Sequence, residues 1–409
     1  MEIKPTKLET AKRDLLKSIN SIVESEEILI EHSLERIVKT EIVSNINLPQ
    51  TANSAVDGYG VLAETLHSNH KIEFDVAGIA KAGHPLNKII KKNQTVEIYT
   101  GAVMPKGIDA IAMHEKCKRF GNKVIINESL LKYQNMRPIG ENLKKGEVVV
   151  KKGKLINPAD IGQLAASGNE AVQVYKKINL SVISTGDELV DTSTNQINEG
   201  HIFDSNRPML LSLFSNKYLK LYDMGIVKDN RKDLAKKYEK CLSKSDMVIS
   251  SGGASDGIED HTQSALKDIG AKCLVWQLAM KPGKPMAVGI IEGKLIFCLP
   301  GNPVAAFVCA KLIIKPLINK LAGCEDLETF TIKLPSGFNH NKRIGRAEYL
   351  RAKIINNENG SFITLHGRKG AGVISSLTGA DGLVEIPLEC EIVRKGDLLK
   401  FIPFNHIGL

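Results

Sequence analysis

The stretch INLSVISTGDE, residues 178–188, begins with a short, mostly apolar run and ends in a turn around Gly186. A run of this kind that stops at a glycine turn is typical of a buried strand. Similar runs alternate with helical patterns as far as residue 323. We expect strands over residues 178–183, 220–227, 247–250, 273–278, 286–291 and 294–299, and helices over residues 206–214, 231–242, 259–269 and from residue 303. This order predicts a mostly parallel sheet with helices on both faces.

The segments before and after this region have different patterns of predicted secondary structure. Apolar residues at helical spacing open the chain: Leu8, Ala11, Leu15, Ile19 and Ile22. Short β-type runs fill residues 51–126, Asn157-Pro158 is a helix-start signal, and β-type runs return after residue 323. We expect an α/β multidomain protein. Its regions would be an N-terminal α+β region at residues 1–175 with a β-rich lobe at about 50–135, the α/β sheet domain at 176–325, and a small β-barrel-like domain at 330–409.

The composition is that of a folded protein, with 43% hydrophobic and 25% charged residues in a chain of 409. No apolar run reaches the ~18 residues of a membrane helix. The longest candidate, residues 304–318, is interrupted by Lys311 and Lys315. The N-terminus lacks the apolar core of a signal peptide. The seven cysteines are scattered without a Cys-x-x-Cys pair, which argues against a disulfide framework and a structural zinc. Together with the lack of a membrane helix and of a signal peptide, this predicts a cytoplasmic protein with no membrane association.

The net charge of +9 raises the question of a nucleic-acid partner. Nucleic-acid binders concentrate basic residues into stripes, often with interleaved aromatic residues. Here lysines are spread from end to end and aromatic residues make up only 5% of the chain. We therefore expect a solvated, lysine-rich surface and no nucleic-acid binding, while an anionic small-molecule substrate remains compatible with the charge.

Three glycine-rich turns follow strands of the predicted sheet, at residues 183–188, 250–257 and 299–303. Ligands of open parallel sheets bind beyond the carboxyl ends of the strands, and free backbone amides there bind anionic oxygens. The turns predict a phosphate-binding cleft, and neither a Rossmann fingerprint nor a P-loop is present in this region. The binding residues that we expect in these turns are Ser184, Thr185, Gly186, Ser251, Gly252, Gly253, Ser255, Pro300, Gly301 and Asn302.

Charged residues collect at the same edge. Glu188, Asp229 and Asp260 each have an ordinary explanation as a loop or helix-start residue, but together they are typical of ligands for a hard cation such as Mg²⁺. A carboxylate facing an oxyanion at 4 Å costs ~4 kcal/mol at an effective dielectric of 20, so compensating positive charge is needed. Lys281 and Lys284, in the stiff loop KPGKP, are the candidates for it.

The N-terminal region contains three further short stretches whose polar and charged residues are typical of functional loops. SAVDGY at residues 54–59 centres on Asp57, TGA at residues 100–102 begins with Thr100, and RPIGEN at residues 137–142 begins with Arg137. Simple turns would look similar, so these stretches alone leave both interpretations open.

Taken together, these strings resemble the MoeA/gephyrin family of molybdenum insertases, and the likeness runs over nearly the whole chain. Residues 54–59 are similar to the family's Ser-Ala-Met-Asp-Gly-Tyr, residues 184–189 to Ser-Thr-Gly-Asp-Glu-Leu, and residues 280–285 to Met-Lys-Pro-Gly-Lys-Pro. The other matching segments are residues 98–105, 137–146, 251–260 and 299–303.

The resemblance implies a molybdopterin-binding type of α/β domain, an elongated homodimer, and active sites formed between subunits. Molybdate would be inserted into adenylylated molybdopterin, with release of AMP and with Mg²⁺ as cofactor. The implied catalytic residues are Asp57, Thr100, Glu188, Asp229, Asp260, Lys281 and Lys284, and Arg137 and Arg346 would join the substrate-binding residues. Molybdopterin adenylyltransferase and chaperones of molybdoenzymes are the implied protein partners.

Four positions depart from the family pattern: Asn142, Asp256, Gln277 and Ala371. Gln277 replaces a frequent basic residue, and Ala371 replaces a small hydroxyl residue, so contacts to substrate could differ there. Two alternatives remain open. The chain could be a molybdopterin adenylyltransferase, although that resemblance covers only the α/β domain, or a non-catalytic dimeric scaffold of the same fold.

Overall fold

The structure is a computed structural model that describes residues 5–22, 24–66, 72–194, 197–253, 261–358 and 360–404. The predicted central sheet has six strands in the order β16-β13-β17-β21-β20-β18. These strands are β16 (Leu219–Val227), β13 (Ile178–Thr185), β17 (Met247–Ser251), β21 (Lys294–Leu299), β20 (Ala287–Ile291) and β18 (Lys272–Trp276). The first four are parallel, and β20 is antiparallel to both β21 and β18. Because only β20 is reversed, the prediction of a mostly parallel sheet is confirmed.

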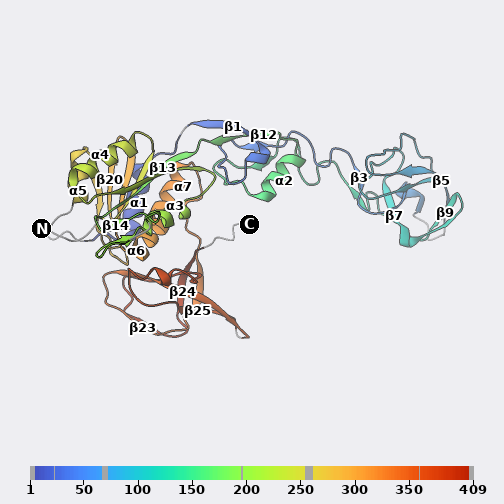
Figure 1. Cartoon of the computed structure of the whole chain (residues 1–409). Helices are drawn as coiled ribbons and strands as arrows, with labels where there is room; N and C mark the ends of the chain where they lie inside the picture. Colours follow the sequence, from blue (N-terminus) through green and yellow to red (C-terminus); the bar gives the residue numbers. More distant parts are fainter. Residues whose placement is uncertain are drawn as a thin grey trace.

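Helices cover both faces of this sheet (Figure 1). One face packs on α1 (Leu8–Ser18), α3 (Asn206–Leu213), α6 (Pro303–Cys309), a π-helical turn, η4 (Ala310–Ile314), and α7 (Lys315–Leu321). The other face packs on α4 (Arg231–Leu242) and α5 (His261–Asp268). Residues of β17 alternate between the two cores, with Met247 and Ile249 in the first and Val248 in the second. Although α1 opens the chain, it belongs to the core of this domain.

A narrow region connects the α/β domain to a distant lobe. Its strand pairs are β1 (Ser25–Leu29) with β12 (Ala171–Tyr175) and β2 (Ile42–Val43) with β11 (Val148–Val150), beside η1 (Ile30–His32) and α2 (Pro158–Ala166). Asn157 caps α2, because its side chain accepts from Asp160 N while the Asp160 side chain accepts from Asn157 N. The helix start predicted at Asn157-Pro158 is therefore confirmed.

The lobe is β-rich, as expected, and lies at the far end of the elongated chain (Figure 1). Its sheet has the order β7-β4-β6-β5-β9-β8. The elements are β3 (Asn53–Ser54), β4 (Gly58–Val61), η2 (Ala63–Leu66), β5 (Ile72–Ala80), β6 (Gln94–Ile98), β7 (Ala110–Met113), η3 (His114–Lys116), β8 (Cys117–Phe120), β9 (Lys123–Ile126) and β10 (Met136–Arg137).

The C-terminal domain is also β-rich. Its elements are β22 (Ile332–Pro335), β23 (His340–Asn341), β24 (Ala347–Asn357), β25 (Gly360–Leu365), η5 (Ile374–Ser376), β26 (Gly382–Ile386), β27 (Ile392–Val393) and β28 (Leu398–Pro403). The strand β19 (Met280–Lys281), which follows β18 of the α/β domain, pairs in parallel with β24. This pairing ties the lysine loop to the C-terminal sheet. Within the described ranges, no helix is both long and apolar enough to cross a membrane.

Candidate active site

The three glycine-rich turns meet at one edge of the central sheet. Strands β13, β17 and β21 are parallel neighbours, so their carboxyl ends lie side by side. Gly252 N donates to Leu299 O at 3.1 Å, and a Cβ placed on Gly301 would lie 3.8 Å from the Cα of Gly252. The structure therefore brings together the turn residues that were expected from the sequence, within the described part of the chain.

Close backbone packing explains the glycine at the centre of the second turn. Gly252 has a φ of +102°, and a Cβ there would lie 2.0 Å from Thr185 O. Any other residue would collide with the backbone of the first turn, in addition to the strain of the left-handed conformation. The side chains of Ser184, Thr185 and Ser251 are buried among these turns, whereas Gly301 and Asn302 are exposed at the edge, where an anionic ligand can contact them.

Two of the three predicted metal ligands flank these turns. A Cβ on Gly186 would lie 2.6 Å from Glu188 Oε2, and one on Gly253 would lie 3.5 Å from Asp229 Oδ1. Asp229 Oδ1 is buried and has no hydrogen-bond partner among the described residues. A buried carboxylate oxygen of this kind is costly unless a cation or donor pairs with it, so the geometry fits a metal ligand.

The third predicted ligand, Asp260, lies outside the described residues, as do Ser255 and Asp256. In the described part of the chain, no group of three or more His, Cys, Asp and Glu side chains is placed to hold a metal ion. The metal site with Glu188, Asp229 and Asp260 therefore stays a prediction.

A cleft of about 910 Å³ lies beside the turns, between the α/β domain and the C-terminal domain. Five of the residues predicted for the site line it: Lys281, Lys284, Pro300, Asn302 and Arg346. Ala371, one of the departures from the family pattern, lines it as well. The cleft is strongly basic, since its lysines and arginines are Lys281, Lys284, Lys342, Arg343, Arg346, Arg351, Arg368 and Lys369 against the two acids Glu348 and Glu391. Such a lining favours a substrate that carries several negative charges.

Most of this wall was missed by the sequence analysis. Glu348 on β24 is buried, accepts from Lys281 Nζ at 3.0 Å and lies 2.8 Å from His340 Nε2. Burial acts to raise the pKa of Glu348, but the hydrogen bonds from His340 and Lys281 outweigh it and hold that pKa below its ordinary value. No local pattern around residue 340 or 348 marked a partner for the lysine loop. Only the pairing of β19 with β24 brings these groups together.

The start of α3 at Asn206 was predicted, but the contacts of Asp204 and Asn206 with the site were missed. Ser184 Oγ donates to Asp204 Oδ1 at 2.9 Å, and Asn206 Nδ2 donates to Ser251 Oγ at 2.8 Å. These contacts join α3 to the first and second turns.

The predicted site residues of the N-terminal region lie elsewhere. Thr100 donates from its backbone N and its Oγ1 to Asp57 Oδ1, at 2.7 and 2.8 Å, and these bonds lower the pKa of Asp57. Arg137, on β10, is paired with Asn53 in the same lobe. Within one chain the lobe and the α/β domain lie at opposite ends (Figure 1), so Asp57, Thr100 and Arg137 do not reach Glu188 of their own chain.

Family models match three consecutive parts of the chain. The MoeA N-terminal region (domain I and II) matches residues 6–168, a domain described as "Probable molybdopterin binding domain" matches residues 181–320, and the MoeA C-terminal region (domain IV) matches residues 333–404. The three matches follow the order of the lobe-bearing region, the α/β domain and the C-terminal β domain.

Relatives match over nearly the full length. A molybdopterin molybdenumtransferase of Haemophilus influenzae is 33% identical, with 98% of this chain and 99% of the relative covered. One of Staphylococcus aureus is 31% identical, with 88% and 86% covered. The crystal structure of a molybdopterin biosynthesis MoeA protein from Pyrococcus horikoshii OT3 superposes with a TM-score of 0.86 at 28% identity, covering 98% of this chain and 100% of that one. The resemblance read from the motifs is thus confirmed, and the chain belongs to the MoeA family of molybdenum cofactor biosynthesis enzymes.

Proposed function

We propose that the chain inserts molybdate into the dithiolene of adenylylated molybdopterin and releases AMP. The observation that carries the proposal is the continuity of two anion-binding surfaces. The turns at Gly252 and Gly301 lie together, and Pro300 and Asn302 of the third turn also line the basic cleft. A substrate could therefore place its pyrophosphate on the turns while molybdate lies beside Lys281 and Lys284.

The chain's own residues would act mainly by holding two reactants together. Lys281 and Lys284 lie on a loop fixed by β19 and by Gly283, where a Cβ would lie 2.6 Å from Cys309 Sγ. A lysine pair on a fixed loop can orient a tetrahedral dianion against the dithiolene sulfurs, so that an encounter of dilute reactants becomes a reaction within one complex. As the two dithiolene sulfurs bond to molybdenum, the two thiol protons and one oxo group of molybdate leave as water. A separate water molecule then cleaves the phosphoanhydride bond to yield AMP, which makes the insertion irreversible.

Glu188 and Asp229, with Asp260, would hold Mg²⁺ beside the pyrophosphate. The unpartnered, buried oxygen of Asp229 supports this assignment. When bound, the ion would neutralise the repulsion between these carboxylates and the phosphate oxygens. Glu188 and Asp229 themselves fix where the phosphates lie relative to the turns.

The lobe would complete the active site of a partner subunit. Asp57 and Thr100 form a preorganised, exposed pair at the far end of an elongated chain. An arrangement of two chains with C₂ symmetry could bring each lobe to the other chain's cleft. We place this homodimer in the cytoplasm, because the cysteines are scattered without disulfide-type spacing.

The test is a reaction with purified protein, adenylylated molybdopterin, molybdate and Mg²⁺. We expect AMP to appear together with a product that activates a cofactor-free molybdoenzyme. Consumption of ATP to adenylylate molybdopterin would instead identify the adenylyltransferase alternative. Absence of both activities, with normal dimers, would identify a scaffold. The basic C-terminal wall of the cleft favours insertion, since it adds cations beyond the turns of the α/β domain.

A further inference from the structure

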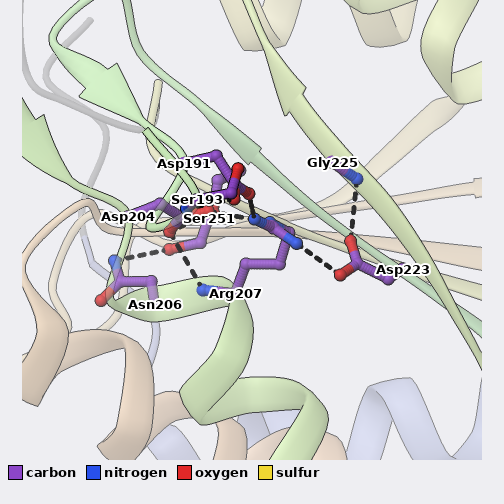
Figure 2. A network of polar contacts seen from close by, with 9 residues as sticks. Asp191, Ser193, Asp204, Asn206, Arg207, Asp223, Gly225 and Ser251 are labelled. Carbon is purple, nitrogen blue, oxygen red and sulfur yellow. Dashed lines mark hydrogen bonds and ion pairs between the residues drawn. The ribbon is translucent and has the colours of Figure 1, made fainter. Parts of the chain in front are cut away.

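Two residues at the start of α3, Asp204 and Asn206, contact all three turns of the candidate site. Figure 2 shows the contact of Asn206 with Ser251 and the ion pairs of Arg207. Asp204 accepts from Ser184 Oγ of the first turn at 2.9 Å. Asn206 Nδ2 donates to Ser251 Oγ of the second turn and to Gly301 O of the third, each at 2.8 Å. Asp204 and Asn206 thus link turns that carry predicted substrate-binding residues, although neither was assigned to the substrates.

The Asn206 amide group bridges the second and third turns. Asn206 is only 8% exposed, so water does not compete for the two hydrogen bonds that its amide group donates. The orientation of the amide is fixed by Gly301 O, since a carbonyl oxygen can only accept. Asn206 therefore adds a buried side-chain link to the direct contacts between these two turns, which are Gly252 N to Leu299 O at 3.1 Å and Ser251 Oγ to Pro300 O at 3.4 Å.

Arg207 anchors the same segment to the rest of the domain. Its Nε donates to Asp204 Oδ2 at 2.9 Å, its Nη2 donates to Asp191 Oδ2 at 2.5 Å, and its Nη1 donates to Asp223 on β16. Asp191 follows β14 (Leu189–Val190), which pairs with β15 (Ile202–Phe203). The turn that carries Glu188 is therefore held at both ends, through Ser184 to Asp204 and through Asp191 to Arg207.

We propose that Asn206 is a positioning residue for the phosphate of the adenylyl group. It sets the distance between the turn at Ser251–Gly252 and the turn at Gly301, while Arg207 holds the turn that carries Glu188. The inference rests on the proposed function, because it takes the turns as the site of the adenylyl phosphate. A purely structural Asn206 would stabilise the domain without favouring one substrate over the other.

The test compares Asn206→Ala with Asn179→Ala. Asn179 is a matched control: its Nδ2 donates to Asp246 Oδ2 at 3.1 Å near the start of β13, at the opposite edge of the same sheet. For Asn206→Ala we expect AMP to bind on the order of tenfold more weakly in isothermal titration, because displaced groups bind poorly. The KM for adenylylated molybdopterin should rise with it, while the KM for molybdate stays at the wild-type value. Asn179→Ala should keep wild-type AMP affinity.

A second variant guards against loss of folding. Asn206→Asp keeps the side-chain shape and can accept from Ser251 Oγ, but it cannot donate to Gly301 O, so it should weaken AMP binding as well. Unchanged AMP affinity in both Asn206 variants would overturn the proposal, and so would an equal loss in Asn179→Ala. A wild-type protein that binds AMP but forms no cofactor would refute the proposed function and leave the role of Asn206 standing. A wild-type protein that forms cofactor but does not bind AMP would overturn the role of Asn206 and leave the proposed function standing.

Discussion

The carboxylate of Glu348, in the C-terminal domain, accepts a hydrogen bond at 3.0 Å from Lys281 Nζ, in the lysine loop of the α/β domain. The Lys281 side chain is 63% exposed, whereas that of Glu348 is 9% exposed. A buried acid therefore holds a long, mobile cation at the mouth of the basic cleft. His340 Nε2 lies 2.8 Å from the second carboxylate oxygen and limits the rotation of the acid.

Replacement of this acid should impair the use of molybdate. In Glu348→Gln the charged partner of Lys281 is lost, and hydrogen bonds to charged groups contribute about 1.5–3 kcal/mol. We expect the KM for molybdate to rise on the order of tenfold, with a smaller change in the KM for adenylylated molybdopterin. Steady-state kinetics with each substrate varied in turn measure the difference.

Glu385→Gln provides the control for this prediction. Glu385 lies on the neighbouring strand β26 and pairs with Lys400 at 3.3 Å, away from the residues that line the cleft. Like Glu348→Gln, the substitution Glu385→Gln removes one carboxylate from the C-terminal sheet. Equal effects of the two substitutions on the KM for molybdate would refute a specific role for Glu348.

Asp229→Asn should raise the Mg²⁺ concentration needed for AMP release. The substitution keeps the side-chain shape but removes the charge of an oxygen that is buried without a partner in the described chain. Loss of one charged ligand weakens the binding of a hard cation. Titration of the reaction rate with Mg²⁺ gives the half-saturating concentration, which we expect to increase at least about tenfold.

Asp187→Asn is the matched control for Asp229→Asn. Asp187 Oδ1 accepts from Asp229 N at 3.1 Å, and an asparagine oxygen can accept the same bond. This variant removes an equal charge at the same edge while the loop keeps its contact. If both variants shift the Mg²⁺ dependence equally, the cause is general electrostatics and not a ligand role for Asp229.

Two inactive variants should restore activity when they form mixed dimers. We expect Asp57→Ala and Glu188→Ala each to fold and dimerise but to form no cofactor, as we also expect for Asp260→Ala. If each active site takes Asp57 from one subunit and Glu188 from the other, a mixed dimer contains one intact site. Random mixing then yields about a quarter of wild-type activity.

Co-expression of the two variants with different affinity tags isolates the mixed dimers for assay. The control is co-expression of Glu188→Ala with Asp260→Ala. Both changes lie in the α/β domain, so no site of that mixed dimer is intact. Inactive mixed dimers of Asp57→Ala with Glu188→Ala would exclude the shared active site.

The sequence sufficed for features that depend on neighbouring residues. Helix α4 has the predicted bounds because Leu234, Tyr238 and Cys241 recur on one face. The glycine-rich turns also converge as expected, because parallel strands bring their carboxyl ends to one edge. A strand was predicted over residues 273–278, but β18 ends at Trp276, since Gln277 has a φ of +67° and the chain leaves the sheet there.

Contacts between distant segments could not be predicted. Lys281 and Glu348 are 67 positions apart, and Asn206 and Gly301 are 95 apart. No periodicity connects such positions, because their distance depends on how whole elements pack. Apart from Arg346, the C-terminal wall of the cleft and the bridge at Asn206 were therefore missed for the same reason.

The domain junction contains a lysine whose titration should be visible in the stability of the protein. Lys311, on the π-helical turn η4, is 4% exposed, and its Nζ donates to Phe404 O at 2.5 Å. The rings of Phe307 and Phe404 pack edge to face with centroids 4.9 Å apart, so the end of the C-terminal domain is held against this helix. Burial, with a smaller contribution from the charge of Lys315, lowers the pKa of Lys311 to about 8.

Lys311→Met should change how the stability depends on pH. Between pH 8 and 10.5 the unfolded wild type binds more protons than the folded one, so its free energy of unfolding gains a term that rises with pH. Methionine keeps the apolar part of the side chain but does not titrate, so it makes no pH-dependent contribution to the free energy of unfolding. The difference in thermal midpoint, wild type minus Lys311→Met, should therefore increase from pH 8 to 10.5. Lys320→Met, which removes a less buried ammonium that donates to Leu16 O, separates loss of a hydrogen bond from the effect of burial. Parallel curves for wild type and Lys311→Met over this range would show that the lysine titrates alike in both states, contrary to its burial in the structure.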